Sequence, residues 1–180
     1  RRLHGLKALR IVSATLVNAD LADLEGLDLL ETVWLASPRV TDDGLYYLSH
    51  LPALRELRLS CPQIRGPGFV SLAALPSLQR LHLAGTGLKD ATMHHLAKLP
   101  SLCEIGLKDL PISDKGLAHF SGLRHLQTLD LFNTQVTDEG LALLKSLPKL
   151  RRVNLAKRMG NRSSITDAGL EHLASIDSLE

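Results

Sequence analysis

The sequence repeats with a period of 24 residues, and this period constrains the fold more than any other feature. Leucine occurs at seven equally spaced positions, Leu3, Leu27, Leu51, Leu75, Leu99, Leu123 and Leu147. Similar phrases follow these leucines, most clearly in the residues that begin at Leu51, Leu75 and Leu147. A fixed period of this length predicts a solenoid, in which each repeat buries its apolar side only against its neighbours.

Each repeat combines a strand pattern with a helix pattern. Residues 128–132 alternate polar and apolar, which predicts a strand with one buried face. Leucines at three-residue spacing follow over residues 141–147, as on one stripe of a helix. Thr137 is placed to cap this helix, and Pro148 prevents it from continuing. Each repeat is therefore predicted to form a short strand, a turn and about two turns of helix.

The recurring phrases resemble those of a known family. The strand phrase L-x-x-L-x-L and the helix start T-D-x-G-L, seen at residues 41–45, 113–117 and 166–170, look like leucine-rich repeats. They most resemble the bacterial and ribonuclease-inhibitor-like types, and the resemblance covers residues 3–180. It implies an α/β fold, a right-handed, curved horseshoe solenoid with a parallel β-sheet on the concave face and short helices on the convex face. It also implies a function in binding.

Three departures from the family pattern affect the prediction. The Asn or Cys that many members place just beyond the strand is mostly absent. The third repeat has residues 65–68 in place of the capping phrase, so its helix is expected to start later or to be shorter. An insertion within residues 156–164 contains no leucine, and we expect it to be the most mobile interior segment. Its basic residues are Lys157, Arg158 and Arg162.

The chain is predicted to be a single leucine-rich-repeat domain over residues 1–180, with about seven repeats. It starts and stops inside repeats, so we expect it to be a fragment of a longer protein whose caps are missing. Cys61 and Cys103 lie on strands two repeats apart, about 9.6 Å at the usual strand spacing, whereas a disulfide needs Cα atoms within about 7 Å. Extracellular solenoids of this kind often have caps stapled by disulfides, and none is visible in this sequence, which favours a reducing compartment, either the cytoplasm or a host cell into which the protein is delivered.

Candidate binding residues lie at the outward positions of the predicted strands. Trp34, the single tryptophan, falls in the middle of an exposed row, where folding does not require it. Tryptophan and arginine are enriched at binding hot spots, and Arg10 and Arg58 are expected to flank this ring closely enough for cation–π stacking. The candidate partner-binding residues are Arg10, Trp34, Glu56, Arg58, Arg80, His82, Glu104, Lys108, Asp130, Phe132, Arg152 and Asn154.

Charge and motifs narrow the class of function. The chain has 21 basic and 19 acidic residues, and this near balance disfavours nonspecific nucleic-acid binding. No run of 18 apolar residues occurs, so no membrane insertion is expected. His95 and His119 are predicted to stack in adjacent helices, but no third ligand completes a metal site. Since no catalytic or cofactor-binding motif is present, we expect neither enzymatic activity nor a cofactor.

The sequence favours a protein-recognition module that binds a protein partner through the concave strands. The alternative is the substrate-recognition domain of a larger enzyme, such as a ubiquitin ligase, a kinase or a secreted bacterial effector, whose catalytic part lies outside this chain. A third interpretation, nucleic-acid binding through Arg151, Arg152 and the basic insertion, predicts a steep salt dependence. A solvated sheet face without a partner also remains open, and neither the partner nor the oligomeric state can be predicted.

Overall fold

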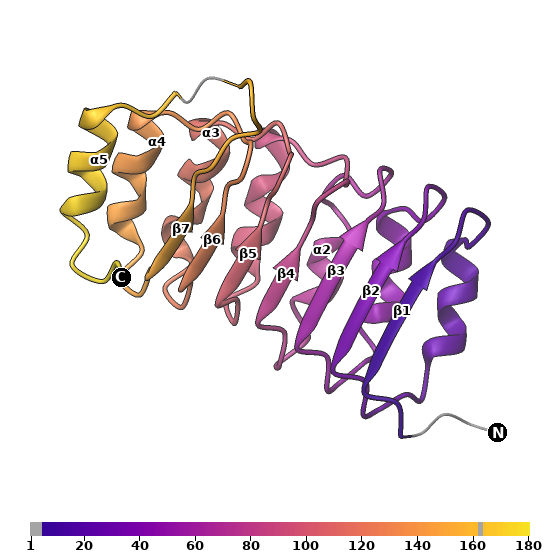
Figure 1. Cartoon of the computed structure of the whole chain (residues 1–180). Helices are drawn as coiled ribbons and strands as arrows, with labels where there is room; N and C mark the ends of the chain where they lie inside the picture. The colour runs from indigo at the N-terminus through magenta and orange to yellow at the C-terminus, as the bar shows by residue number, and fades with distance from the viewer. Residues whose placement is uncertain (1–4, 162–163) are drawn as a thin grey trace.

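The computed structural model describes residues 5–161 and 164–180 and forms one elongated array. Seven parallel strands make a single sheet in the order of the sequence, and helical segments cover the opposite side (Figure 1). The two ends of the chain lie at opposite ends of the array. This arrangement confirms the right-handed α/β solenoid predicted from the repeat. Leu3 and Arg162, named above, lie outside the described residues.

The strands pair in one constant register. Their bounds are β1 (Ala8–Val12), β2 (Thr32–Ala36), β3 (Glu56–Ser60), β4 (Arg80–His82), β5 (Glu104–Gly106), β6 (Thr128–Asp130) and β7 (Arg152–Asn154). Leu9 pairs with Val33, and Val33 pairs with Leu57, a shift of 24 residues at each step. The same position of every repeat therefore lies in one row across the sheet.

The helical side mixes α-helical and 3-10 turns. The α-helices are α1 (Leu45–Leu48), α2 (Phe69–Leu72), α3 (Asp114–Leu117), α4 (Asp138–Leu143) and α5 (Asp167–Ala174). The 3-10 segments are η1 (Asn18–Leu24), η2 (Asp42–Gly44), η3 (Asp90–Lys98), η4 (Ala118–Gly122) and η5 (Leu144–Ser146). In the third repeat α2 begins only at Phe69, after residues 65–68 that replace the capping phrase, so the predicted late start is confirmed.

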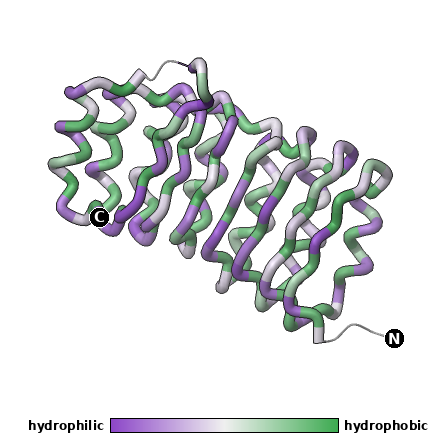
Figure 2. Tube along the Cα trace, viewed as in Figure 1, coloured by the Kyte–Doolittle hydropathy of each residue, from purple (hydrophilic) through white to green (hydrophobic). Residues whose placement is uncertain are grey.

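The core is one continuous cluster that runs along the array between the sheet and the helices. Leu57, Leu81, Ile105 and Leu129 occupy one row of the sheet and are fully buried. Polar and apolar residues alternate along most strands, so one side of the sheet faces this core and the other faces solvent (Figure 2). The strand predicted over residues 128–132 is shorter than expected, since β6 ends at Asp130, but the two leucines predicted to point inward, Leu129 and Leu131, are buried.

The helix starts of successive repeats are joined by side-chain hydrogen bonds. Asp114 Oδ1 accepts a bond of 2.9 Å from the backbone N–H of Thr137, and the Thr137 hydroxyl donates to Asp114 Oδ2 at 2.7 Å. Asp90 with Ser113 and Asp138 with Thr166 repeat this pair of bonds. We call this series, with Asn18–Thr41 as its first step, the helix-start ladder. Thr137 thus occupies the predicted N-cap position, but it bonds the preceding repeat.

Glycine in the T-D-x-G-L phrase makes room for this ladder. A Cβ atom on Gly140 would lie 2.1 Å from Asp114 Oδ1, and one on Gly169 would lie 2.2 Å from Asp138 Oδ1. The aspartate of one repeat therefore fills the space that a side chain of the next repeat would need. Between the third and fourth repeats the pattern is broken, because Gly66 stands at the aspartate position.

The insertion after β7 is fastened by side-chain bonds that the sequence did not reveal. Arg158 donates from Nε and Nη2 to the two carboxylate oxygens of Asp109, each at 3.0 Å. Asn161 Nδ2 donates to Asn133 Oδ1 at 2.8 Å. The expectation of high mobility rested on the small burial of this segment. Residues 158–161 are exposed, as expected, but these side-chain bonds are a restraint that the sequence analysis did not include.

Two further sequence predictions concern the thiols and the membrane. Cys61 is buried and Cys103 is partly buried, and both are free, as predicted from the strand spacing. Within the parts of the chain that the structure describes, no helix combines the length and the apolar character that crossing a bilayer requires.

Candidate functional site

The candidate residues lie together on the solvent side of the sheet, which we call the sheet face. The strand register places ten of the twelve in two neighbouring rows. Lys108 and Phe132 follow two residues after the central row, one repeat apart. The predicted rows of outward residues are therefore confirmed by the strand register, and the binding role of these residues stays a prediction.

Trp34 is partly exposed on β2 and is covered by an arginine from one side only. Its side chain is 37% exposed, and Arg10 Cζ lies 3.7 Å from the centroid of its ring. The predicted cation–π contact is therefore present with Arg10. Arg58, the neighbour on the other side, turns instead toward Glu56.

A second cation–aromatic pair was missed in the sequence analysis. Lys108 Nζ lies 4.6 Å from the centroid of the Phe132 ring. The two residues are 24 positions apart, and this spacing was the available signal. The sheet face thus carries two such pairs, one on β1 and β2 and the other just beyond β5 and β6.

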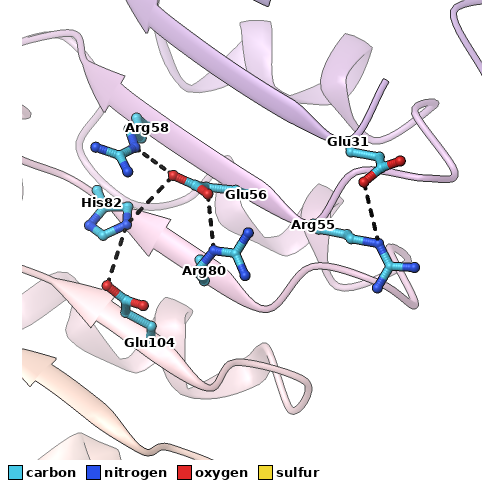
Figure 3. Close-up of polar contacts among 7 residues, drawn as sticks. All are labelled: Glu31, Arg55, Glu56, Arg58, Arg80, His82 and Glu104. Carbon is cyan, nitrogen blue, oxygen red and sulfur yellow. Dashed lines mark hydrogen bonds and ion pairs between the residues drawn. The ribbon is translucent and has the colours of Figure 1, made fainter. Parts of the chain in front are cut away.

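Glu56 is the centre of a charged cluster, and its side chain is buried although it lies at an outward strand position. It is only 8% exposed, and its two carboxylate oxygens accept from Arg58 Nε at 2.5 Å and from Arg80 Nε at 3.0 Å (Figure 3). Burial by itself raises the pKa of Glu56, but the bonds from both arginines outweigh it and hold this pKa below its ordinary value. The prediction of Glu56 as an exposed contact residue requires correction, because two flanking arginines cover its carboxylate.

His82 lies between two carboxylates of this cluster. Its Nε2 atom is 4.0 Å from Glu56 Oε1 and 3.7 Å from Glu104 Oε1 (Figure 3). Burial, followed by the charge of Arg58, lowers the pKa of His82, and the nearby carboxylates oppose this shift without reversing it. The His82 ring also lies over Gly106. A Cβ atom at position 106 would lie 2.8 Å from His82 Nδ1, so a larger residue there would clash with the imidazole.

The carboxylate of Asp130 is engaged by amide donors. Its Oδ1 atom accepts from the backbone N–H of Phe132 and from Asn154 Nδ2, both at 2.9 Å. Arg152 lies beside this group and donates from Nε to Thr128 Oγ1 at 3.3 Å. The end of the sheet face at β6 and β7 is therefore a neutral-to-basic, hydrogen-bonded surface.

The sheet face is hollowed between the two cation–aromatic pairs. The hollow has a volume of about 290 Å³. Its lining residues are Trp34, Arg58, Leu59, Ser60, His82, Ala84, Gly106, Lys108 and Asp130. Seven of the twelve candidates do not line it, so the hollow singles out Trp34, Arg58, His82, Lys108 and Asp130 from the larger set.

The helix side has a hollow of its own, which the sequence analysis did not predict. It measures about 520 Å³ and is lined by residues of the second and third repeats, including Tyr46, Tyr47 and Pro67. The Tyr46 side chain is 56% exposed. This surface is the natural comparison for any experiment on the sheet face.

The histidines of the helix side do not form the predicted pair. The ring of His119 lies next to His94, with centroids 5.9 Å apart, and His94 in turn stacks on His95 at 3.9 Å. The sequence analysis had paired His119 with His95, because equal spacing does not fix which way each ring turns. Over residues 5–161 and 164–180, no group of three His, Cys, Asp or Glu residues is arranged to hold a metal ion.

Comparison with known proteins identifies both a sequence motif and a fold. A sequence profile of the family described as "Leucine Rich repeat" matches residues 122–145. No curated protein matches the sequence.

Three solved structures show the similarity of fold. The internalin InlF of Listeria monocytogenes matches with a TM-score of 0.68 and 21% identity, over 99% of this chain and 47% of that chain. Internalin C2 of the same species gives 0.61 and 23%, over 98% and 80%. The Drosophila Toll–Spatzle complex gives 0.65 and 21%, over 87% and 21%. The present chain thus spans about half of the InlF chain.

Proposed function

We propose that this chain, which has a leucine-rich-repeat motif at residues 122–145 and the fold of leucine-rich-repeat proteins, is a recognition module whose sheet face binds a protein partner. The observation that carries this proposal is the position of Trp34, which stands 37% exposed beside a hollow and beneath Arg10. A partly exposed tryptophan on a rigid sheet loses little conformational entropy when a partner covers it. Such residues dominate the energetics of many interfaces.

The composition of the sheet face supports a protein as the partner. Cationic, anionic and aromatic side chains alternate within a few ångströms, as in the Glu56 cluster and the Lys108–Phe132 pair. A mosaic of this kind matches the mixed charge of another protein surface better than the uniform charge of a nucleic-acid backbone. Among the solved relatives, Toll was determined as a complex with Spatzle.

The remaining features support a binding function without catalytic activity. They also support a reducing compartment as the location of the protein. The hollow on the sheet face holds no pairing of nucleophile and base within hydrogen-bond distance in the described residues. The free thiols Cys61 and Cys103 fit a compartment in which disulfides do not form.

Site-specific photo-cross-linking tests which side binds. A photoreactive amino acid at Ala36 on the sheet face is expected to cross-link to the partner in extracts of the native cell. The same group at Leu143, which is 40% exposed on the helix side, is expected not to do so. The captured partner is then purified for titration.

Calorimetric titration with the purified partner gives the decisive comparison. Trp34→Ala is expected to weaken binding by about 2 kcal/mol or more, roughly a thirtyfold rise in Kd. Tyr46→Ala is the matched control and is expected to leave Kd unchanged. Tyr47 is unsuitable as a control, because it packs against the core. If Tyr46→Ala weakens binding and Trp34→Ala does not, the partner binds the helix side and the proposal is wrong.

A further inference from the structure

We propose that the hollow on the sheet face is a subsite for an acidic side chain of the partner, flanked in the partner by an aromatic or aliphatic residue. This inference rests on the proposed function and adds the chemistry of the bound segment to it. It is carried by the shape of the hollow, by the pairing of the charges around it and by the aromatic rings of Trp34, which lines it, and Phe132, which lies behind Lys108.

The shape follows from three small residues in successive repeats. Ser60, Ala84 and Gly106 line the hollow, and the larger side chains of Lys108 and Phe132 follow in the row of Ser60 and Ala84. Gly106 stays small because the imidazole of His82 lies over it. The volume of about 290 Å³ is at or below the lower end of the range for sites that enclose drug-sized ligands. It suits one or two side chains inserted from a partner.

Two of the three carboxylates near the hollow already accept hydrogen bonds, and the third, Glu104, lies 3.7 Å from His82 Nε2. Glu56 accepts from both Arg58 and Arg80, and the Asp130 carboxylate accepts two hydrogen bonds from amide groups. A cationic side chain that entered the hollow would therefore have to compete with existing donors.

The two cationic residues that line the hollow, Arg58 and Lys108, have N–H donors that no carboxylate among the described residues uses. Lys108 lies over Phe132 and, in the described ranges, is paired with no carboxylate. Arg58 uses Nε for Glu56, and its guanidinium carries further N–H donors. An incoming carboxylate would meet both Lys108 and Arg58 in the lining of one hollow. Charge complementarity thus favours an acidic group.

One aromatic ring lines the hollow, and a second lies behind the lining residue Lys108. Trp34 lines it on the β2 side, and Phe132 lies beneath Lys108 on the β6 side. A residue next to the acidic one in the partner would lie against one of these rings, where aromatic or aliphatic side chains bury apolar area. The bound segment is therefore expected to combine Asp or Glu with a neighbouring apolar residue.

Selection from a phage-displayed library of random dodecapeptides tests this inference directly. The probes are the wild-type chain, Ala84→Trp, Lys108→Glu and the control Lys115→Glu on the helix side. Ala84→Trp fills the hollow without changing charge, and Lys108→Glu reverses one charge on an exposed residue, so the second variant remains informative if the first fails to fold.

The expected result is a wild-type pool enriched severalfold in Asp or Glu adjacent to Phe, Tyr, Trp, Leu or Ile. Ala84→Trp is expected to lose this enrichment, Lys108→Glu to shift it toward Lys and Arg, and Lys115→Glu to keep it. The inference is overturned if no sequences are enriched, or if wild type and Ala84→Trp select the same ones. If Trp34→Ala still weakens partner binding in that case, the proposed function stands and only the acidic subsite fails.

Discussion

The helix-start ladder and the sheet face use the same 24-residue register in opposite ways. Along the ladder, Asp90, Asp114 and Asp138 make the same pair of bonds to the Ser or Thr of the next repeat. Along the central row of the sheet face, residue type changes at every step, from Arg10 through Trp34 and Arg58 to His82. The ladder therefore repeats the same hydrogen bonds, whereas the sheet face changes its residue type from one repeat to the next.

This difference separates residues that hold repeats together from residues that are free to recognise something else. Each repeat must satisfy the backbone N–H groups at its helix start, so the same solution recurs wherever the geometry recurs. An outward strand position has no such requirement. Variation there, together with a partly exposed tryptophan, is what a surface shaped for a particular partner would show.

The largest effect on stability is expected from adding a methyl group to the ladder. Gly140→Ala would place Cβ 2.1 Å from Asp114 Oδ1, and the resulting shift is expected to reduce the free energy of unfolding by about 1–3 kcal/mol. Urea denaturation measures this change. Gly122→Ala is the matched control, since a Cβ there meets nothing within 4 Å, and it should be neutral or slightly stabilising. Equal losses at both glycines would contradict the crowding explanation.

Removing the carboxylate should produce a comparable or slightly smaller loss. Asp114→Ala leaves the backbone N–H of Thr137 without its acceptor, which is expected to reduce the free energy of unfolding by about 1–2 kcal/mol. A double-mutant cycle sharpens the comparison. In the Asp114→Ala background, Gly140→Ala should become less destabilising, because the atom that it meets is gone; additive effects would argue against the ladder.

On the sheet face, acid is expected to remove one specific contribution. The folded-state pKa of Glu56 lies below the ordinary 4.5, so its ionised form stabilises the fold above that pH. This stabilisation is lost as the pH falls from about 4.5 through the folded-state pKa. Wild type should thus exceed Glu56→Gln in free energy of unfolding at pH 7 and converge with it in acid, as measured by urea denaturation at several pH values. A difference that grows in acid would contradict this assignment.

The smallest effect on stability is expected at the residue proposed to matter most for binding. Trp34→Ala removes a partly exposed ring and its contact with Arg10, and exposed cation–π contacts contribute about 0.5–1 kcal/mol. Its free energy of unfolding should therefore change less than that of Gly140→Ala. If Trp34→Ala loses more free energy of unfolding than Gly140→Ala, Trp34 stabilises the fold, and the proposed difference between the sheet face and the helix-start ladder is wrong.

The framework of this protein can be predicted from its 24-residue period. The period of 24 residues gave the strand register, the rows of the sheet face, the separation of Cys61 from Cys103 and the position of Trp34 beside Arg10. These features follow from the backbone pairing and the apolar periodicity. Both recur from repeat to repeat, so one repeat is enough to predict the register of the others, although not the altered third repeat or the insertion after β7.

The hydrogen-bond partner of each polar side chain, in contrast, depends on how the repeats pack. Arg58 bonds Glu56 in preference to stacking on Trp34, Arg158 reaches Asp109 across 49 positions, and Asp114 bonds the next repeat. Long polar side chains have several acceptors within reach, and the choice depends on burial and on competition among neighbours that the stacked repeats bring together. The repeat spacing determines the position of a residue's backbone, and the packing of neighbouring side chains determines where its charged group lies.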